Sequence, residues 1–339
     1  MLIRKSSFIR LLTAFIIYTL FAVYIYLPYF KNFQRFDFLL IPNLVLAATG
    51  CYVLSRRWIL SFTCSVLAGI IYGFSPMLLS LARFHPTAGT IAAAIPWSFC
   101  IPAYFRLFTN RRWMQAPLCA VPFLAILAYF KLAAAFSLFP APLQLEPSLQ
   151  TLASFLVPTA ASAKAPLLFS IYHIPIAGLL IGLCLFVETR RYGISLIIFA
   201  GLVLTFTDGL TVVSPAVWLM IPLLCLAIIT AEGLSAFLNA TSLDFEWLAA
   251  TAGILALCSA VSFMFSIKYY KFFAGLAQPA ADTLATEARL FLLGAACIAL
   301  VTIISKLNLR LKPIRLLLIT APCLIDFLIT STAITDKIL

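Results

Sequence analysis

The chain has 339 residues, of which 64% are hydrophobic and only 10% are charged, and its mean hydropathy is +1.10. Soluble domains are about 45–50% apolar and about 25% charged, so this composition excludes a water-soluble fold and predicts an integral membrane protein. The 23 Lys and Arg residues outnumber the 11 Asp and Glu residues, but they lie in short gaps between apolar runs. Such a pattern is typical of topology signals at a membrane surface and does not indicate nucleic-acid binding.

Apolar runs separated by Pro, Gly and charged residues predict an all-α, polytopic transmembrane bundle of about eleven spans, with ten to twelve as the range. We expect a single transmembrane domain over residues 1–339. In chain order the helices are expected at residues 8–30, 37–55, 58–81, 88–108, 117–139, 167–187, 193–212, 215–236, 247–267, 288–305 and 314–333.

The distribution of positive charge predicts the orientation of the chain. If the N-terminus is cytoplasmic, most of the cations fall in cytoplasmic segments, including Arg10, Arg56 and Arg57. The positive-inside rule therefore predicts a cytoplasmic N-terminus. With eleven spans, the C-terminus lies on the opposite side of the membrane, which we call the outer face.

Two longer connections are predicted on the outer face. In the first, residues 140–166, leucines recur at helical spacing after Pro147. This spacing favours a short amphipathic helix along the membrane interface, and a proline-rich connector is an equal alternative. The second connection, Lys268 to Glu287, is polar, and a short helix within it is an alternative to a loop.

The cysteines and histidines do not indicate a metal centre. The nine cysteines fall almost entirely within apolar runs and form no C-x-x-C pair, as expected for small hydrophobic residues in helices. There are two histidines and no clustered acids. We therefore predict no cofactor and no protein-built metal site, and leave a divalent-metal requirement open.

Three segments carry a resemblance to a known family. Residues 72–97, YGFSPMLLSLARFHPTAGTIAAAIPW, contain a Phe-Ser-Pro break, a short outer loop with Arg-Phe-His-Pro, and an Ala-rich helix reaching Pro-Trp. Residues 217–238, VWLMIPLLCLAIITAEGLSAFL, form an apolar run ending near Ala-Glu-Gly-Leu, and residues 39–60 end with two arginines before the next span. Together they resemble the YfhO-like membrane proteins of the GT-C glycosyltransferase superfamily, over roughly residues 36–240.

The resemblance implies a glycosyltransferase that uses a polyprenyl-phosphate sugar. A carboxylate would deprotonate the acceptor hydroxyl, and cations would receive the phosphate charge. That family carries its acidic residue in a long first outer loop. Here the corresponding gap is residues 31–37, and Asp37 is its only acid, so Asp37 is the candidate catalytic base.

Other polar residues are candidates for binding the lipid phosphate or substrate. They share the predicted outer face, where contacts with lipid headgroups and helix caps are the alternative roles. These candidates are Lys31, Arg35, Arg83, His85 and His173. Two ionisable residues fall inside predicted spans, Lys131 and Asp326, and we expect both to face the bundle interior because charge is costly in lipid.

The leading functional hypothesis is therefore a GT-C-like membrane glycosyltransferase, or a non-catalytic relative that binds lipid-linked glycans. The alternative is a membrane subunit or scaffold that packs against partner proteins, and a transporter is the weaker third hypothesis. The partners expected are membrane lipids, a polyprenyl-phosphate sugar and other membrane proteins. The resemblance implies the bacterial cytoplasmic membrane as the location.

Overall fold

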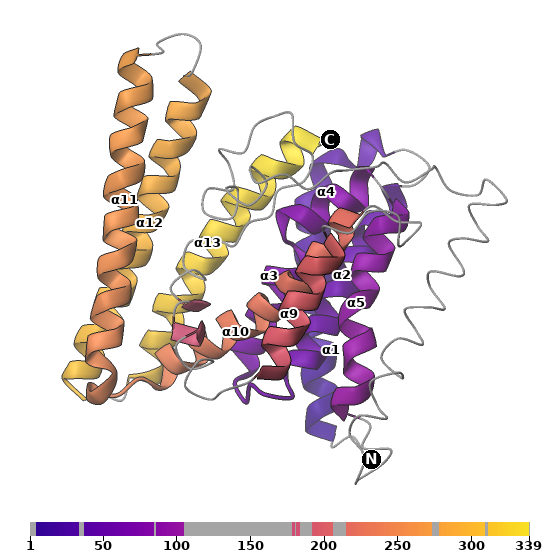
Figure 1. Cartoon of the computed structure of the whole chain (residues 1–339), viewed down its shortest axis with the longest axis horizontal. Coiled ribbons are helices and arrows are strands. Elements are labelled where there is room, and N and C mark those ends of the chain that lie inside the picture. The colour runs from indigo at the N-terminus through magenta and orange to yellow at the C-terminus, as the bar shows by residue number, and fades with distance from the viewer. Residues whose placement is uncertain are drawn as a thin grey trace, which may run out of the picture. The chain divides into compact units, whose positions relative to one another are not determined.

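The protein is described by a computed structural model over residues 5–33, 37–84, 86–104, 178–179, 181–183, 192–205, 215–272, 278–308 and 311–338. All regular structure within these ranges is helical (Figure 1). Five helices there are long and apolar enough to cross a membrane, and a bent helix pair makes a sixth span if it is counted as one. The all-α membrane class is confirmed, and the count of eleven spans stays a prediction.

The helices divide into two compact units. Unit 1 contains five helices from the first third of the chain, the later helix α9, the 3-10 turn η4 (Pro215–Leu219) and the start of α10. Unit 2 contains the rest of α10 and the three long C-terminal helices. The helices are α1 (Lys5–Tyr26), α2 (Leu40–Ser55), α3 (Phe62–Gly73), α4 (Pro76–Phe84), α5 (Pro86–Tyr104), α9 (Tyr192–Thr205), α10 (Met220–Asn239), α11 (Phe245–Phe272), α12 (Gln278–Lys306) and α13 (Lys312–Ile338).

Two short 3-10 turns connect the first two spans. The turn η1 (Leu27–Asn32) follows α1, and the turn η2 (Asp37–Leu39) leads directly into α2. Pro28 stands in the first turn of η1, where a residue without a backbone N–H costs no hydrogen bond. The candidate base Asp37 consequently lies at the start of a span.

The span predicted over residues 58–81 forms two helices, α3 and α4, which are bent by 45° at Phe74 and Ser75. The bend lies at the Phe-Ser-Pro break noted in the sequence. Pro76 begins α4 because its ring supplies no N–H to continue α3, and the Ser75 hydroxyl accepts a hydrogen bond from the Leu78 N–H. This break gives α4 its own direction and ends it at the turn that carries Arg83.

Small residues let the helices of unit 1 approach closely. An added Cβ at Gly69 would lie 2.1 Å from the Tyr18 hydroxyl and 2.7 Å from the Ala48 carbonyl oxygen. The Tyr18 hydroxyl also donates a hydrogen bond of 3.0 Å to the Val66 carbonyl. Glycine at position 69 therefore allows α1, α2 and α3 to meet at one point.

Helix α5 packs along α2 in the same direction. The Trp97 indole N–H donates to the Leu46 carbonyl at 2.9 Å, and the ring covers Gly50, where a Cβ would lie 2.6 Å from the indole nitrogen. Nearer the start of both helices, the Thr90 hydroxyl lies 3.3 Å from the Asn43 side-chain oxygen. The two helices therefore share a long interface that is mainly apolar and includes these two polar contacts.

In unit 2, α11 and α12 lie side by side as a long hairpin (Figure 1). Serines of α11 donate hydrogen bonds to carbonyls of α12, from Ser259 to Ala288 at 2.7 Å and from Ser266 to Ala281 at 2.8 Å. Both helices extend beyond the predicted spans, so the predicted outer loop from Lys268 to Glu287 is largely helical. The predicted spans ended at charged residues. A helix, however, continues beyond its apolar part as long as its backbone N–H and C=O groups form hydrogen bonds within the helix.

A second close contact in unit 2 joins α10 to the helical residues 178–179 and 181–183. A Cβ on Gly233 would lie 1.8 Å from the Gly178 carbonyl oxygen, and one on Gly182 would lie 2.2 Å from the Ile229 carbonyl oxygen. Paired glycines four residues apart are a common device for close packing of membrane helices. The predicted interfacial segment 140–166 lies outside the described residues.

Candidate functional site

The central feature of unit 1 is an ion pair between Asp37 and Arg83. The Arg83 guanidinium nitrogen Nη1 donates to the Asp37 carboxylate oxygen Oδ1, although the two residues are 46 positions apart. Asp37 is 3% exposed, and the Arg83 side chain is 21% exposed. Of the residues that we predicted for the site, the structure brings these two together.

Local structure explains why these two charges are tolerated. Asp37 occupies the first turn of η2, and Arg83 occupies the last turn of α4. Each charge therefore lies at the helix end whose dipole favours it. A buried carboxylate without a partner would be strongly unfavourable, and the guanidinium supplies that partner.

Tyr26 borders the pair from the end of α1. Its side chain is 2% exposed and lies within electrostatic range of both Arg83 and Asp37. The tyrosine therefore lies close to both charges of the pair.

Neutral polar residues continue the site along α2 and α5. Asn43 is 4% exposed, and its Oδ1 lies 3.3 Å from the Thr90 hydroxyl. The same hydroxyl lies 2.9 Å from the Pro86 carbonyl oxygen. We call Asp37, Asn43, Arg83 and Thr90 the polar cluster.

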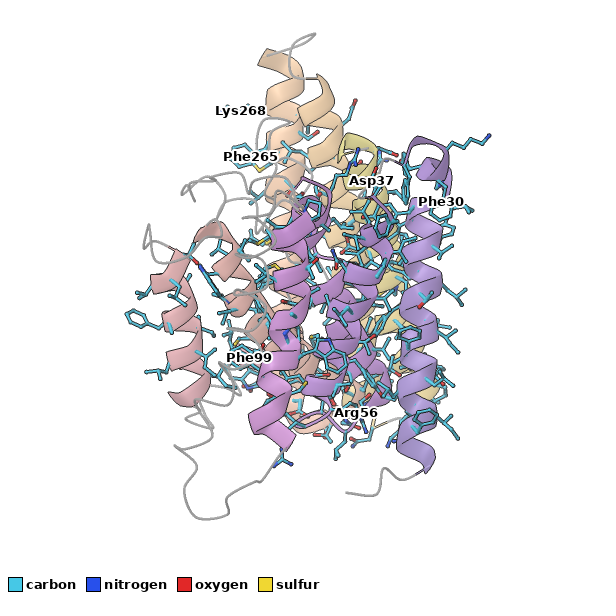
Figure 2. The ribbon with its side chains drawn as sticks, turned by 90° about the vertical axis from the view of Figure 1, so that its right-hand side faces the viewer. Phe30, Asp37, Arg56, Phe99, Phe265 and Lys268 are labelled. Atoms are coloured by element: carbon cyan, nitrogen blue, oxygen red, sulfur yellow. The ribbon has the colours of Figure 1, made fainter. Side chains whose placement is uncertain are left out.

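Charged residues lie at both ends of unit 1. Figure 2 shows Phe30 and Asp37 at one end of the helices and Arg56 at the other. Lys31 lies in η1 at the Asp37 end, where it is exposed. Arg56 caps the turn after α2 by donating to the Ile59 and Leu60 carbonyls, so it stabilises that turn and takes no part in the polar cluster.

Arg35, His85, His173 and Lys131 lie outside the residues whose side chains are described. Asp326 is buried on α13, at 1% exposure, and belongs to unit 2.

Sequence reasoning missed several buried polar residues. Asn43 and Thr90 carry no charge, and the search for site residues had followed charges and histidines. The available signal was an asparagine inside an apolar run, because a buried amide also needs partners in lipid. Glu287 was assigned to an outer loop, but it is 1% exposed within α12.

Unit 2 has its own buried cation. Arg315 on α13 is 6% exposed and donates through Nη1 to the Ala240 carbonyl after α10. An arginine bonded to the end of a helix satisfies a carbonyl that has no partner within that helix. This contact stabilises the α10 to α13 junction and explains the arginine without a catalytic role.

Within the described residues, no group of three or more His, Cys, Asp or Glu side chains is placed to hold a metal ion. The described cysteines are all unbonded, and all but Cys258 are buried. The chemistry of the polar cluster therefore rests on one carboxylate, one guanidinium, one carboxamide and one hydroxyl.

Comparison with known proteins supplies no relative. The chain matches no family model, no curated protein and no solved structure. The resemblance to the YfhO-like proteins accordingly stays an expectation, and function must be argued from the residues themselves.

Proposed function

We propose that the protein is a membrane glycosyltransferase, or a close functional equivalent, that binds a polyprenyl-phosphate sugar at the Asp37 and Arg83 pair. The observation that carries this proposal is the pairing itself. A carboxylate and a guanidinium from distant segments meet at the end of the spans, where a lipid phosphate would reside. We further propose the bacterial cytoplasmic membrane, with the Asp37 end on the outer face.

The two charges can divide the work of sugar transfer. The Asp37 carboxylate takes the proton of an acceptor hydroxyl, whose oxygen then bonds to the anomeric carbon of the sugar. The bond from that carbon to the phosphate oxygen breaks, and the lipid phosphate leaves with the electron pair. Arg83 binds the departing phosphate, because guanidinium recognises phosphate in a bidentate geometry.

In this mechanism the ion pair is the resting state of the site. An arriving phosphate competes with Asp37 for the Arg83 guanidinium, and its binding frees the carboxylate to act as a base. The partial exposure of Arg83, compared with the burial of Asp37, supports this order of events because the guanidinium is the charge that a ligand can reach.

A second candidate is a non-catalytic membrane subunit. The observation in its favour is that Arg83 already neutralises Asp37 and ties η2 to α4. In that case the pair is a structural clamp, and its charges do not act on a ligand. Binding of lipid phosphate separates the two candidates.

The test uses purified protein in lipid nanodiscs. We expect native mass spectrometry to detect a complex with a polyprenyl-phosphate hexose, and Arg83→Gln to weaken it by about tenfold or more because a charge-assisted hydrogen bond is lost. Asp37→Asn should retain binding and abolish release of lipid phosphate when membrane extract supplies the acceptor. Arg57→Gln, an exposed arginine beyond α2, is the matched control.

Two results would overturn the proposal. Equal lipid binding by the wild type, Arg83→Gln and Arg57→Gln would remove the phosphate site. Unchanged phosphate release by Asp37→Asn would remove Asp37 as the base. Loss of folding is checked separately by size-exclusion chromatography of each variant.

A further inference from the structure

A second part of the polar cluster lies deeper along the same helices and is unused by the mechanism above. Asn43 is 4% exposed in α2, and its amide nitrogen Nδ2 has no hydrogen-bond partner among the described residues. A buried amide donor without an acceptor costs about 1–3 kcal/mol. An amide nitrogen of this kind inside a span indicates that its hydrogen-bond acceptor is a group other than the described residues.

The contact with Thr90 does not remove this deficit. The Thr90 hydroxyl has one proton, and it lies closer to the Pro86 carbonyl, at 2.9 Å, than to Asn43 Oδ1, at 3.3 Å. If Pro86 receives the proton, the Thr90 hydroxyl has none left to donate to Asn43 Oδ1. In the orientation that the structure gives, Asn43 Nδ2 has no partner among the described residues.

The position of Asn43 connects it to the ion pair. Asp37 precedes Asn43 at the entrance to α2, and Arg83 precedes Pro86 and Thr90 around the turn from α4 to α5. The chain segments that supply the charged pair therefore also supply the neutral pair.

We infer that Asn43 and Thr90 bind a hydroxyl group of the sugar carried by the lipid phosphate. The inference rests on the proposed function and assigns the part of the ligand that these residues recognise. A hydroxyl both donates and accepts, so it can complete a carboxamide and a neighbouring hydroxyl together. A second phosphate at this position would instead face the Pro86 carbonyl oxygen, which lies 2.9 Å from the Thr90 hydroxyl, and would be repelled.

The experiment compares two probes in nanodiscs, polyprenyl phosphate and the same lipid phosphate carrying a hexose. Asn43→Leu preserves side-chain volume and removes the amide, and Thr90→Val removes the hydroxyl. We expect each change to weaken binding of the hexose probe by about tenfold, the value of one lost hydrogen bond, and to leave the bare lipid phosphate unchanged. Ser98→Ala, which deletes a hydroxyl bonded within α5, is the control and should affect neither probe.

The outcomes distinguish this inference from the proposed function. Equal loss for both probes in Asn43→Leu and Thr90→Val would overturn it, because a contact that only joins α2 to α5 cannot select for the sugar. Unchanged binding of both probes would also overturn it. Neither result contradicts the proposed phosphate site. That proposal is contradicted only if Arg83→Gln binds both probes as well as the wild type does. Binding of free hexose that is lost in Asn43→Leu would support the same subsite filled by the acceptor sugar.

Discussion

At the scale of single residues, the polar cluster shows how an apolar chain carries charge. Asp37 is buried and satisfied by Arg83, because a lone carboxylate in low dielectric would be neutralised or expelled. Asn43 lies further along α2, and its amide nitrogen has no hydrogen-bond partner among the described residues. The charges of the pair are thus satisfied by each other, whereas one donor of the Asn43 amide is not satisfied.

The ion pair predicts a specific pattern of stability. Asp37→Ala and Arg83→Ala should each lower the free energy of unfolding by about 3 kcal/mol, since each leaves one charge without its partner. The exchange Asp37→Arg with Arg83→Asp should restore much of that loss, although both charges then oppose the helix dipoles. Thermal unfolding in detergent measures this, with Arg57→Ala as the control.

An exchanged variant no more stable than the single variants would contradict the pairing. A stable exchanged variant that has lost lipid-phosphate binding would separate the two roles of Arg83. The guanidinium then has to occupy position 83 itself for the ligand to bind.

At the scale of elements, glycines and serines decide how closely the helices pack. Gly69 lies under Tyr18 and Ala48 in unit 1, and Ser259 and Ser266 hold the α11 to α12 hairpin in unit 2. Membrane helices gain little from burying apolar surface, so small residues and interhelical hydrogen bonds set their contacts. Two glycines can therefore differ in how much a substitution destabilises the protein, depending on which atoms lie next to each one.

Two glycine variants test this point. Gly69→Ala should destabilise the protein by about 1–3 kcal/mol, because the new Cβ would overlap the Tyr18 hydroxyl and the Ala48 carbonyl. Gly253→Ala is the matched control, since nothing lies within 4 Å of a Cβ there, and alanine should be neutral or slightly stabilising in that helix. Equal melting temperatures for both variants would show that the contact at Gly69 does not constrain packing.

At the scale of the whole molecule, charged residues lie at both ends of unit 1. Lys31 and the Asp37 pair lie at one end, and the arginine turn at Arg56 lies at the other (Figure 2). Cations concentrate on the cytoplasmic side of membrane proteins. We therefore predict that the Arg56 end faces the cytoplasm and that the site opens on the outer face.

Labelling with a membrane-impermeant maleimide tests this orientation in spheroplasts of a bacterial expression host. Cysteine introduced by Lys31→Cys should react in intact cells, whereas Trp58→Cys should react only after permeabilisation. Both positions are exposed, and wild-type protein gives the background from native cysteines. The reverse pattern would place the site in the cytoplasm and rule out the proposed orientation.

The order of several helices was predicted from the sequence, and the predictions that differ from the structure do so for local reasons. The spans predicted at residues 8–30, 37–55, 215–236, 247–267 and 288–305 coincide with helices that can cross a membrane. The Phe-Ser-Pro break was noted in the sequence, but the predicted span still ran through it to residue 81, because a proline after an apolar run also occurs in kinked but continuous spans. Glu287 was misplaced because apolar windows stop at charges.

The amino-acid sequence by itself determined that this is a helical membrane protein, because the share of apolar residues decides which solvent the chain can occupy. The resemblance to the YfhO-like proteins made Asp37 the candidate base, and the predicted outer face made Arg83 a candidate for phosphate binding. Only the tertiary structure decided that these two meet and that Asn43 faces Thr90, since those contacts join residues more than 45 positions apart. Such contacts depend on helix packing, and packing is set by small residues, bends and buried hydrogen bonds that hydropathy does not register.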